Sequence, residues 1–317
     1  MPNFRQLWTR IRSVETIANH ANHDYSNVFL KNKNDIESLL NVGGKKISDS
    51  NILILGCGYN YPEVILWSSV AKQAIGIDVI EAFWKDGFGA RYRDLRRDGR
   101  GITRSFANTI FDQLTYRRYF DELRKASQLK LDEHNQNLKT YDGRNLPFSD
   151  DTFDVVCSNA VLEHINLDDL AKLSSEISRI TRPSGVSYHI WHNYYSLSGA
   201  HIPDEIAIAY PWGHLREDPQ IISCLNYSGS YLNRMLPEEI IKFLSCGFQC
   251  IAVHPLDKKN NKSENVSEFT YEGEALLTKK LEKELTKYPR NTLLTRAFLF
   301  IGVKEGSGKD NYVITKD

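Results

Sequence analysis

The sequence predicts an α/β protein built on a mostly parallel β-sheet. A continuous apolar run, Ile52–Leu55, ends abruptly in Gly56-Cys57-Gly58, as a strand buried on both faces ends in a tight turn. A second short apolar strand ends at Asp78, and 78 − 56 = 22 positions is the span of a strand–helix–strand unit. The same alternation returns further on, with a strand over 153–158, a helix over 167–180 and a strand over 186–191.

The composition is that of a soluble globular protein. The 317 residues are 41% hydrophobic and 25% charged, and 40 basic residues balance 40 acidic ones. This balance argues against general nucleic-acid binding. No apolar run approaches the roughly 20 residues that span a bilayer, and the sequence starts without the apolar core of a signal peptide. We therefore expect a cytoplasmic protein with no transmembrane segment.

The cysteines form no C-x-x-C pair, and several lie in apolar surroundings. They indicate reduced, buried thiols and not a disulfide framework or a zinc site, so no metal centre is expected. They are Cys57, Cys157, Cys224, Cys246 and Cys250.

Residues 1–48 predict an N-terminal helical cap. Apolar residues recur at helical spacing over 4–18, with arginines off the apolar stripe. After a loop over 20–25, a short helix is expected over 35–40, closed by Gly43-Gly44. A basic amphipathic helix such as the first can contact a membrane surface, although packing on its own domain is commoner.

The glycine turn and Asp78 each allow two interpretations. A G-x-G turn at the carboxyl end of a strand lets backbone approach a ligand, but it also serves as a plain turn. Past the turn, Pro62 and the run Val64–Val70 predict a helix. Asp78 could hold a pair of ribose hydroxyls or could cap the next helix.

Residues 82–138 are too many for an ordinary connection in this fold, so they predict an insertion with helices of its own. Ile110, Phe111, Leu114 and Leu123 mark one of these helices. A cluster of arginines could receive a phosphate or carboxylate of a substrate, or could form a solvated face paired with Asp94 and Asp98. The cluster comprises Arg91, Arg93, Arg96, Arg97, Arg100 and Arg104.

A second insertion, 192–235, is rich in His, Tyr, Trp, Pro and Gly. Because loops carry chemistry more often than cores do, we expect this segment to help form a pocket. Tyr194, Tyr195 and Trp212 could stack on a sugar or ring, or could belong to the core.

The C-terminal part predicts a helix that opens at Pro237 and runs to Cys246-Gly247, followed by a strand over 248–254. Beyond a polar loop over 257–265, we expect a mostly charged helix over 269–288 and a final strand over 295–304. The tail, 305–317, is polar and is expected to be flexible.

Four segments, in this order, resemble the class I S-adenosylmethionine-dependent methyltransferases, in particular their small-molecule branch. They are Ile52–Gly58, Asp78, the stretch from Asp142-Gly143 to His164-Ile165, and Arg179–Gly185. The resemblance covers about 52–80, 138–192 and 236–304. It implies a seven-stranded, mostly parallel Rossmann-like sheet with helices on both faces and an antiparallel last strand. The methyltransferase domain would span 49–304, with the two insertions.

The resemblance also implies S-adenosyl-L-methionine as the cofactor and gives roles to particular residues. Those positions are Gly56, Cys57 and Gly58 for the methionine part, Asp78 for the ribose hydroxyls, Asp142 and Gly143 for the adenine, and Asn159 and Ala160 for the methionine part again. Two positions depart from the family. Ile54 stands where an acid is usual, which removes a charge that supports the ammonium end, and Asn60 replaces the third glycine of the loop.

Methyl transfer from a sulfonium is an in-line displacement, so alignment of the acceptor supplies most of the catalysis. A hydroxyl acceptor also benefits from a general base, and His192, His201 and His214 are the candidates, each of which could instead be structural. His164 is more readily structural. We expect a small-molecule or glycan-type acceptor, methylated at oxygen, and an anionic acceptor would give the arginines a purpose.

Two other functions stay open. A non-catalytic module of the same fold would bind S-adenosylmethionine without transferring its methyl group. A nicotinamide-dependent oxidoreductase would need G-x-G-x-x-G, and Tyr61 stands at the position of the third glycine.

Overall fold

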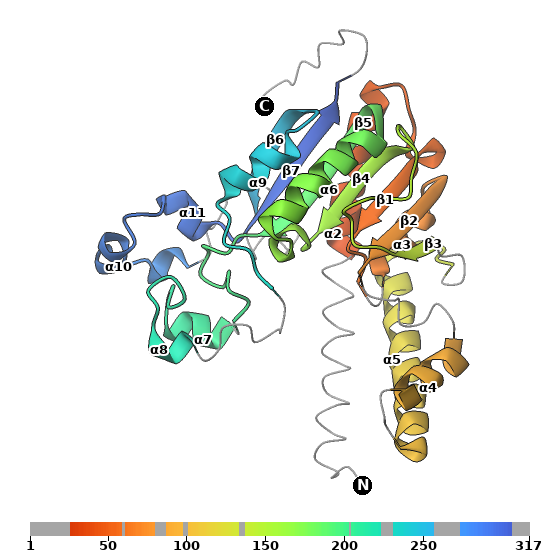
Figure 1. Cartoon of the computed structure of the whole chain (residues 1–317), viewed down its shortest axis with the longest axis horizontal. Helices are drawn as coiled ribbons and strands as arrows, with labels where there is room; N and C mark the ends of the chain where they lie inside the picture. Colours follow the sequence, from red (N-terminus) through yellow and green to blue (C-terminus); the bar gives the residue numbers. More distant parts are fainter. Residues whose placement is uncertain are drawn as a thin grey trace. The chain divides into compact units, whose positions relative to one another are not determined.

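The computed structural model describes residues 26–58, 61–79, 87–97, 101–132, 137–202, 204–222, 231–256 and 273–305 (Figure 1). The chain divides into two compact units, residues 1–142 and 143–317. The helix expected over 4–18, the loops over 20–25 and 257–265, Asn60 and the tail beyond 305 lie outside the described residues. No described helix is long and apolar enough to cross a membrane.

The strands form a seven-stranded sheet in the order β3-β2-β1-β4-β5-β7-β6. The pairs β1–β2, β2–β3 and β4–β5 are parallel, whereas β7 runs antiparallel to both β5 and β6. This order confirms the predicted mostly parallel sheet with its antiparallel last strand. Ligands of such sheets bind at the carboxyl ends of the parallel strands.

The first unit contains β1 (Asn51–Leu55), β2 (Gln73–Asp78), β3 (Asn137–Thr140) and α3 (Pro62–Ser68). Helix α3 packs on β1 and β2, and Gly76 allows the close approach because a Cβ there would lie 2.4 Å from Val64 Cγ2. The sequence did not predict β3, since only one residue of its four, Leu138, is apolar.

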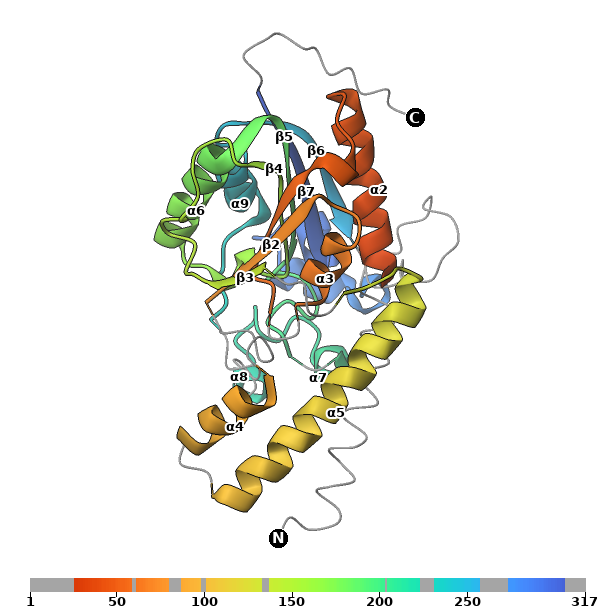
Figure 2. The same ribbon diagram turned by 90° about the vertical axis from the view of Figure 1, so that its right-hand side faces the viewer.

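Three longer helices complete the first unit. Helix α2 (Ser26–Val42) extends well beyond the expected 35–40 and sets Phe29 edge-on against Trp67, with ring centroids 4.9 Å apart. The short η2 (Ile47–Asp49) follows it. The insertion contains α4 (Gly87–Arg97) and α5 (Ile102–Ser127), which lie side by side (Figure 2). The predicted helices of the insertion are therefore confirmed.

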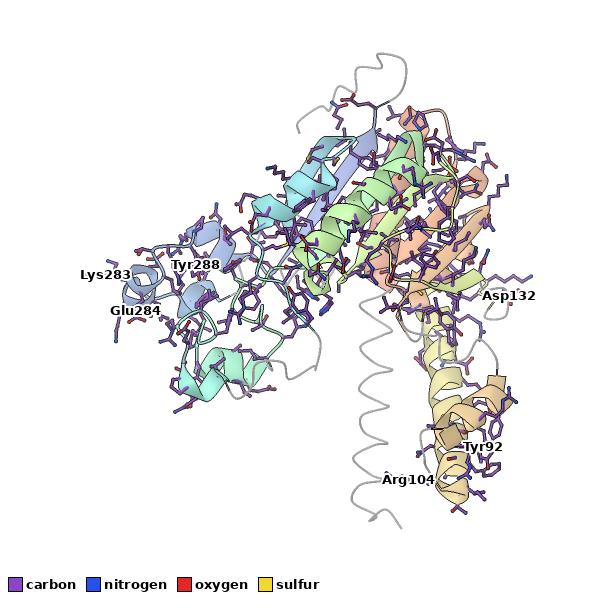
Figure 3. All side chains as sticks on the ribbon, viewed as in Figure 1. Tyr92, Arg104, Asp132, Lys283, Glu284 and Tyr288 are labelled. Atoms are coloured by element: carbon purple, nitrogen blue, oxygen red, sulfur yellow. The ribbon has the colours of Figure 1, made fainter. Side chains whose placement is uncertain are left out.

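The arginine cluster lies on and beside these two helices. Arg93, Arg96 and Arg104 are exposed, and Arg104 is labelled near the start of α5 in Figure 3. The side chains of the other three arginines lie outside the description. The exposed members fit the solvated alternative.

The second unit contains β4 (Phe153–Asn159), η3 (Leu162–His164), α6 (Leu167–Ile180), β5 (Thr181–His192), α9 (Pro237–Leu244), β6 (Phe248–Leu256) and β7 (Ala297–Lys304). Helices α6 and α9 contact each other and cover one face of β5 and β7 (Figure 1). Helix α6 begins and ends where the sequence predicts. Strand β5 begins before the expected residue 186, because Thr181 already pairs with Phe153.

A small separate core fills the rest of the second unit. It joins α7 (Asp204–Ala209) and α8 (Pro219–Ile222) to η5 (Glu274–Leu276), α10 (Lys279–Glu284) and α11 (Arg290–Leu294). Tyr194, Tyr195 and Trp212 are buried in this core, so the core alternative describes them.

The prediction of a single charged helix over 269–288 was wrong. Gly273 takes a left-handed φ of 71° before η5, and the chain then turns repeatedly so that Leu277 and Leu285 enter the small core. Lys283 and Glu284 of α10 are labelled at its outer end in Figure 3.

The expectation of buried thiols holds for only part of the described cysteines. Cys57 and Cys157 are buried and free, but Cys246 and Cys250 are free and exposed. The reason for Cys250 is that β6 ends the strand order and so lies at an edge of the sheet. Cys224 lies outside the described residues.

Candidate active site

The turn after β1 is shaped by two left-handed glycines. Gly56 and Gly58 have φ values of 65° and 67°, a conformation that side chains disfavour. The N–H groups of Gly56 and Cys57 both donate to the Ile77 carbonyl, at 2.8 and 3.2 Å, which ties the turn to β2. A Cβ on Gly58 would meet no described heavy atom within 4 Å, so a ligand has room to approach this backbone.

Asp78, at the end of β2, contacts the glycine turn directly. Its Oδ2 accepts the N–H of Gly58 at 2.7 Å. A carboxylate accepts hydrogen bonds along about four lone-pair directions, and hydroxyl groups are among the donors that it can accept. Asp78 therefore positions the turn with a group of the chemical type expected for a ribose contact. The helix that it might cap instead would begin among residues 80–86, outside the description.

Neither Cys57 in the turn nor Ile54 in β1 places a charge beside the turn. Burial, together with the charge of Asp78, raises the pKa of the Cys57 thiol to about 12, so the thiol stays protonated at neutral pH. Ile54 is 1% exposed and pairs with Gly76 in the core. An apolar side chain thus occupies the position where the resembling family has an acid.

Asp142 comes just after β3 in the chain, at the same edge of the sheet as the ends of β1 and β2. The N–H of Tyr141 donates to the Asp78 carbonyl at 2.7 Å, which continues the β2–β3 pairing past the end of the strand. Asp142 is exposed. Within the first unit, the structure therefore brings together the glycine turn, Asp78 and the chain that leads to Asp142.

The remaining cofactor candidates, Gly143, Asn159 and Ala160, belong to the second unit. Gly143 has a φ of 77°, which favours glycine there. Ala160 has a φ of 55°, which is strained for a residue with a Cβ, and its N–H donates to Ile190 O at 2.9 Å. Strained backbone of this kind concentrates at functional sites.

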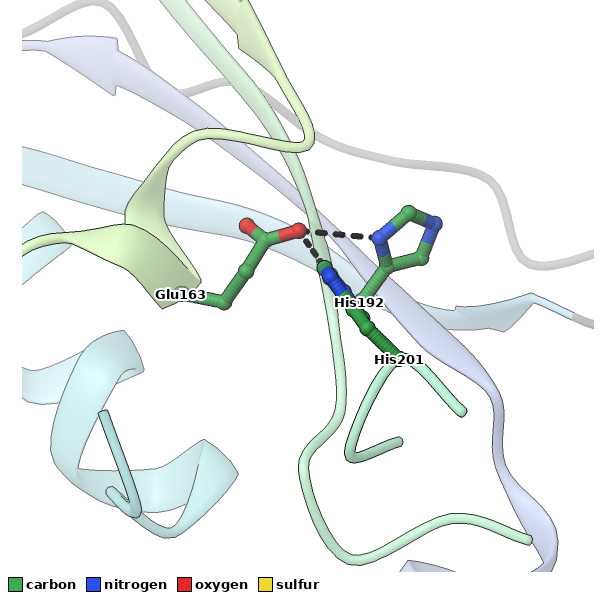
Figure 4. A group of neighbouring side chains, drawn as sticks. All are labelled: Glu163, His192 and His201. Carbon is green, nitrogen blue, oxygen red and sulfur yellow. Dashed lines mark hydrogen bonds and ion pairs between the residues drawn. The ribbon is translucent and has the colours of Figure 1, made fainter. Parts of the chain in front are cut away.

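A carboxylate and two imidazoles gather beyond β4 and at the end of β5. Glu163 in η3 is buried, and its Oε1 lies 2.9 Å from His192 Nδ1 (Figure 4). The His192 backbone N–H also donates to this oxygen at 3.3 Å. The His201 ring stands edge-on to that of His192, with centroids 5.4 Å apart. Together these form the Glu163 cluster: Glu163, His192 and His201.

The electrostatics of the Glu163 cluster favour a charged Glu163 carboxylate and a neutral His201 ring. Burial by itself would raise the pKa of Glu163, but the contact with His192 outweighs it and lowers that pKa below its ordinary value. Burial, aided by the charges of His192 and Arg296, lowers the pKa of His201 to about 4. His201 is therefore neutral at physiological pH and can accept a proton or a Lewis acid.

Two further histidines, His214 and His164, each contact a backbone carbonyl. His214 is buried, its Nε2 donates to the Tyr194 carbonyl at 2.9 Å, and burial lowers its pKa to about 4. This setting is typical of a structural histidine. His164 Nδ1 lies 2.8 Å from the Tyr231 carbonyl, in agreement with the structural role expected for it.

Glu163 was not among the site residues predicted from the sequence. Its only signal was its place in the stretch Val161–Ile165, next to His164. A glutamate at the start of a helix ordinarily indicates a capping or dipole role, so only its burial against His192 identifies it.

Residues 98–188 match the family model described as a methyltransferase domain. The matched segment contains Asp142, Gly143, Asn159, Ala160 and Glu163, and leaves out the glycine turn, Asp78, His192 and His201. No curated protein matches the chain.

The solved structures to which the chain is similar include several methyltransferases. An S-adenosylmethionine-dependent methyltransferase from Mesorhizobium loti is 12% identical, covers 86% of this chain and 96% of its own, and has a TM-score of 0.44. One from Methanosarcina mazei is 14% identical, with 84% and 97% covered and a TM-score of 0.44. Geranyl diphosphate C-methyltransferase from Streptomyces coelicolor A3(2) is 13% identical, with 85% and 77% covered and a TM-score of 0.43. The fold assignment rests on the sheet order itself.

Proposed function

We propose that this chain, whose residues 98–188 match a methyltransferase domain and whose sheet order is the one expected for a class I S-adenosylmethionine-dependent methyltransferase, moves a methyl group to the oxygen of a small-molecule or glycan-type acceptor. The observation that carries the oxygen acceptor is the Glu163 cluster, in which a buried carboxylate lies beside the His192 ring at the carboxyl end of β5 and near the neutral imidazole of His201. Such a group accepts a hydrogen bond from a hydroxyl.

At the cofactor end, the proposal assigns each contact to a group described above. The backbone of Gly56, Cys57 and Gly58 faces the amino-acid part, where the left-handed turn leaves room beside Gly58. Asp78 accepts from the ribose hydroxyls while it holds Gly58. Asp142 accepts from the adenine amino group, with Gly143 beside the ring. Asn159 and Ala160 contact the methionine part through their backbone.

In the reaction, the acceptor oxygen attacks the methyl carbon in line with the sulfur. The C–O bond forms as the C–S bond breaks, its electron pair returns to sulfur, and S-adenosylhomocysteine leaves. The hydroxyl proton passes to the Glu163 cluster or to water. The sulfonium is already an activated donor, so the protein contributes chiefly alignment and a hydrogen-bond acceptor for the hydroxyl. His214, buried and bonded to Tyr194, stays outside this proposed site.

An anionic group on the acceptor would find partners of opposite charge in the exposed arginines of α4 and α5, Arg93, Arg96 and Arg104. We keep the anionic acceptor as a secondary proposal, because exposed arginines are common on solvated helices. A nicotinamide oxidoreductase would need a third glycine where Tyr61 stands, buried at 1% exposure. A non-catalytic module would bind the cofactor and transfer nothing.

The test combines calorimetry with transfer of a labelled methyl group. Wild-type protein should bind S-adenosylmethionine and label an acceptor in a fractionated metabolite extract. Asp78→Ala removes charge-assisted bonds worth about 1.5–3 kcal/mol each, so the dissociation constant should rise roughly 10- to 100-fold. Asp49→Ala is the matched control, since Asp49 is exposed in η2.

Three outcomes would count against the proposal. Equal binding by wild type and Asp78→Ala would remove the ribose role of Asp78. Binding without any labelled product would favour the non-catalytic module. A labelled product whose methyl sits on nitrogen or carbon would overturn the oxygen acceptor.

A further inference from the structure

The Glu163 cluster contains buried polar atoms without hydrogen-bond partners. In the part of the chain that the structure describes, Glu163 Oε2, His192 Nδ1 and His201 Nε2 are each buried and unpartnered. Nearly all buried polar side-chain atoms in proteins have a partner, because an unmet group costs about 1–3 kcal/mol. Three such atoms in one cluster call for a shared explanation.

The three residues also lie close enough together to share one ligand. One donor atom from each of the three residues lies within 4.8 Å of the other two. His192 Nδ1 is 2.9 Å from Glu163 Oε1, yet it forms no hydrogen bond of acceptable direction. An imidazole nitrogen and a carboxylate oxygen at this separation, but not aimed at each other, are arranged as two ligands of one ion are.

The backbone holds the three side chains in place before any ligand arrives. Glu163 is fixed because its Oε1 accepts the backbone N–H of His192. His201 takes a left-handed φ of 55°, a strained conformation that persists only where the surroundings enforce it. His164, the next imidazole, is held by its contact with the Tyr231 carbonyl and stays out of the set.

We propose that Glu163, His192 and His201 bind a divalent transition-metal ion, with Zn²⁺ as the best match. Two imidazole nitrogens and one carboxylate oxygen suit Zn²⁺ and related borderline ions better than Mg²⁺ or Ca²⁺, which prefer oxygen ligands alone. Three protein ligands are the number found in catalytic zinc sites, where a position stays open for water or substrate. No metal was expected from the sequence, because the cysteines form no C-x-x-C pair. Glu163, His192 and His201 lie 29 and 9 positions apart (192 − 163 and 201 − 192), a spacing that matches no ligand motif.

The role of the ion rests on the proposed function. The hydroxyl oxygen of the acceptor would bind at the open position. The ion would orient this hydroxyl and lower its pKa, so that a weaker general base would suffice for the transfer. The existence of the site does not depend on this role, and metal binding is measured without the reaction.

The experiment uses the full-length protein, freed of metal with a chelator and titrated with Zn²⁺ by calorimetry and with Co²⁺ by visible absorption. Wild type should bind one ion, and Co²⁺ should show the intense d–d bands of low-coordinate nitrogen and oxygen ligation. Glu163→Gln and His201→Ala should each weaken binding at least about 10-fold, since each removes one ligand of three. His254→Ala is the matched control, because His254 is exposed on β6.

Absence of stoichiometric Zn²⁺ and Co²⁺ binding, or equal binding by wild type and both ligand variants, would overturn the metal site. Far-ultraviolet circular dichroism, measured on the same samples, confirms that each variant is folded. Undiminished methyl transfer by metal-free wild type would refute the catalytic role proposed for the ion, whereas the site itself is decided by the binding data. Metal binding in a protein that transfers no methyl group would refute only the proposed function.

Discussion

A glycine can matter in two ways, through the backbone conformation that it adopts and through the space that it leaves for a ligand. Gly58 and Gly44 have nearly the same φ, 67° and 71°, and neither would place a Cβ within 4 Å of a described heavy atom. Only Gly58 lies beside Asp78, to which its N–H donates. Substitutions at these two positions therefore separate the loss of stability caused by the backbone conformation from the loss of affinity caused by blocking a ligand.

We predict that substitution by alanine has different effects at Gly58 and at Gly44. Gly58→Ala and Gly44→Ala should each lower the free energy of unfolding by about 1–2 kcal/mol, the cost of a left-handed residue with a Cβ. Gly58→Ala should also raise the dissociation constant of S-adenosylmethionine at least about 10-fold, or about 1.4 kcal/mol. Urea unfolding and calorimetry measure the two effects. Unchanged affinity in Gly58→Ala would show that the cofactor does not approach this backbone.

Among the elements, α6 does more than cover the sheet. Its last turn carries Arg179, whose guanidinium donates to the carbonyls of Leu146 at 3.1 Å and Phe148 at 2.7 Å. Glu176, one turn earlier, accepts the Leu146 N–H at 2.6 Å, and its bond to Arg179 lowers its pKa. The helix thus fixes the loop that begins at Gly143, the expected adenine contact.

We predict that Arg179→Met loosens this loop while it keeps most of the side-chain stem. The variant leaves two carbonyls without their donors, so the free energy of unfolding should fall by about 1–3 kcal/mol and cofactor affinity should fall severalfold. Lys172→Met on the same helix is the control, because its ion pair with Asp169 is 3.8 Å long and exposed, worth less than about 1 kcal/mol. Equal effects of the two substitutions would contradict a positioning role for Arg179.

The whole molecule buries histidines that must stay neutral. His189 is buried in β5 with its Nδ1 2.8 Å from Ser158 Oγ, and burial lowers its pKa to about 3. Burial likewise lowers the pKa of His214 to about 4. Unfolded, both should titrate near pH 6.5. Below that pH the unfolded chain binds more protons than the folded one, so stability is complete above about pH 6.5 and is lost as the pH falls toward 4 and 3.

We therefore expect the free energy of unfolding to fall between about pH 7.5 and pH 5, with each of these histidines contributing about 2 kcal/mol. His214→Gln keeps an N–H donor for the Tyr194 carbonyl but cannot titrate, so its loss over this interval should be about 2 kcal/mol smaller. Urea unfolding at the two pH values measures the difference. Equal losses in wild type and variant would mean that His214 is not buried in its neutral form.

The predictions from sequence succeeded where a periodic apolar pattern and tertiary burial coincide. Helix α6 shows this most clearly, because it spans Leu167–Ile180, the bounds that its amphipathic spacing predicts. They failed where tertiary packing decides. Strand β3 has almost no apolar pattern and exists because it pairs with β2. The segment over 269–288 is helical in composition, but it bends to place Leu277 and Leu285 in the small core.

The sequence by itself determined the α/β class, the glycine turn and the carboxylate that follows the second strand, because each depends on local backbone rules and strand periodicity. Only the tertiary structure decided that Asp78 holds Gly58, that Trp212 is core, and that Glu163 joins His192 and His201. These outcomes depend on contacts between residues distant in the chain, where burial and direction, and not residue type, decide what a side chain can bind.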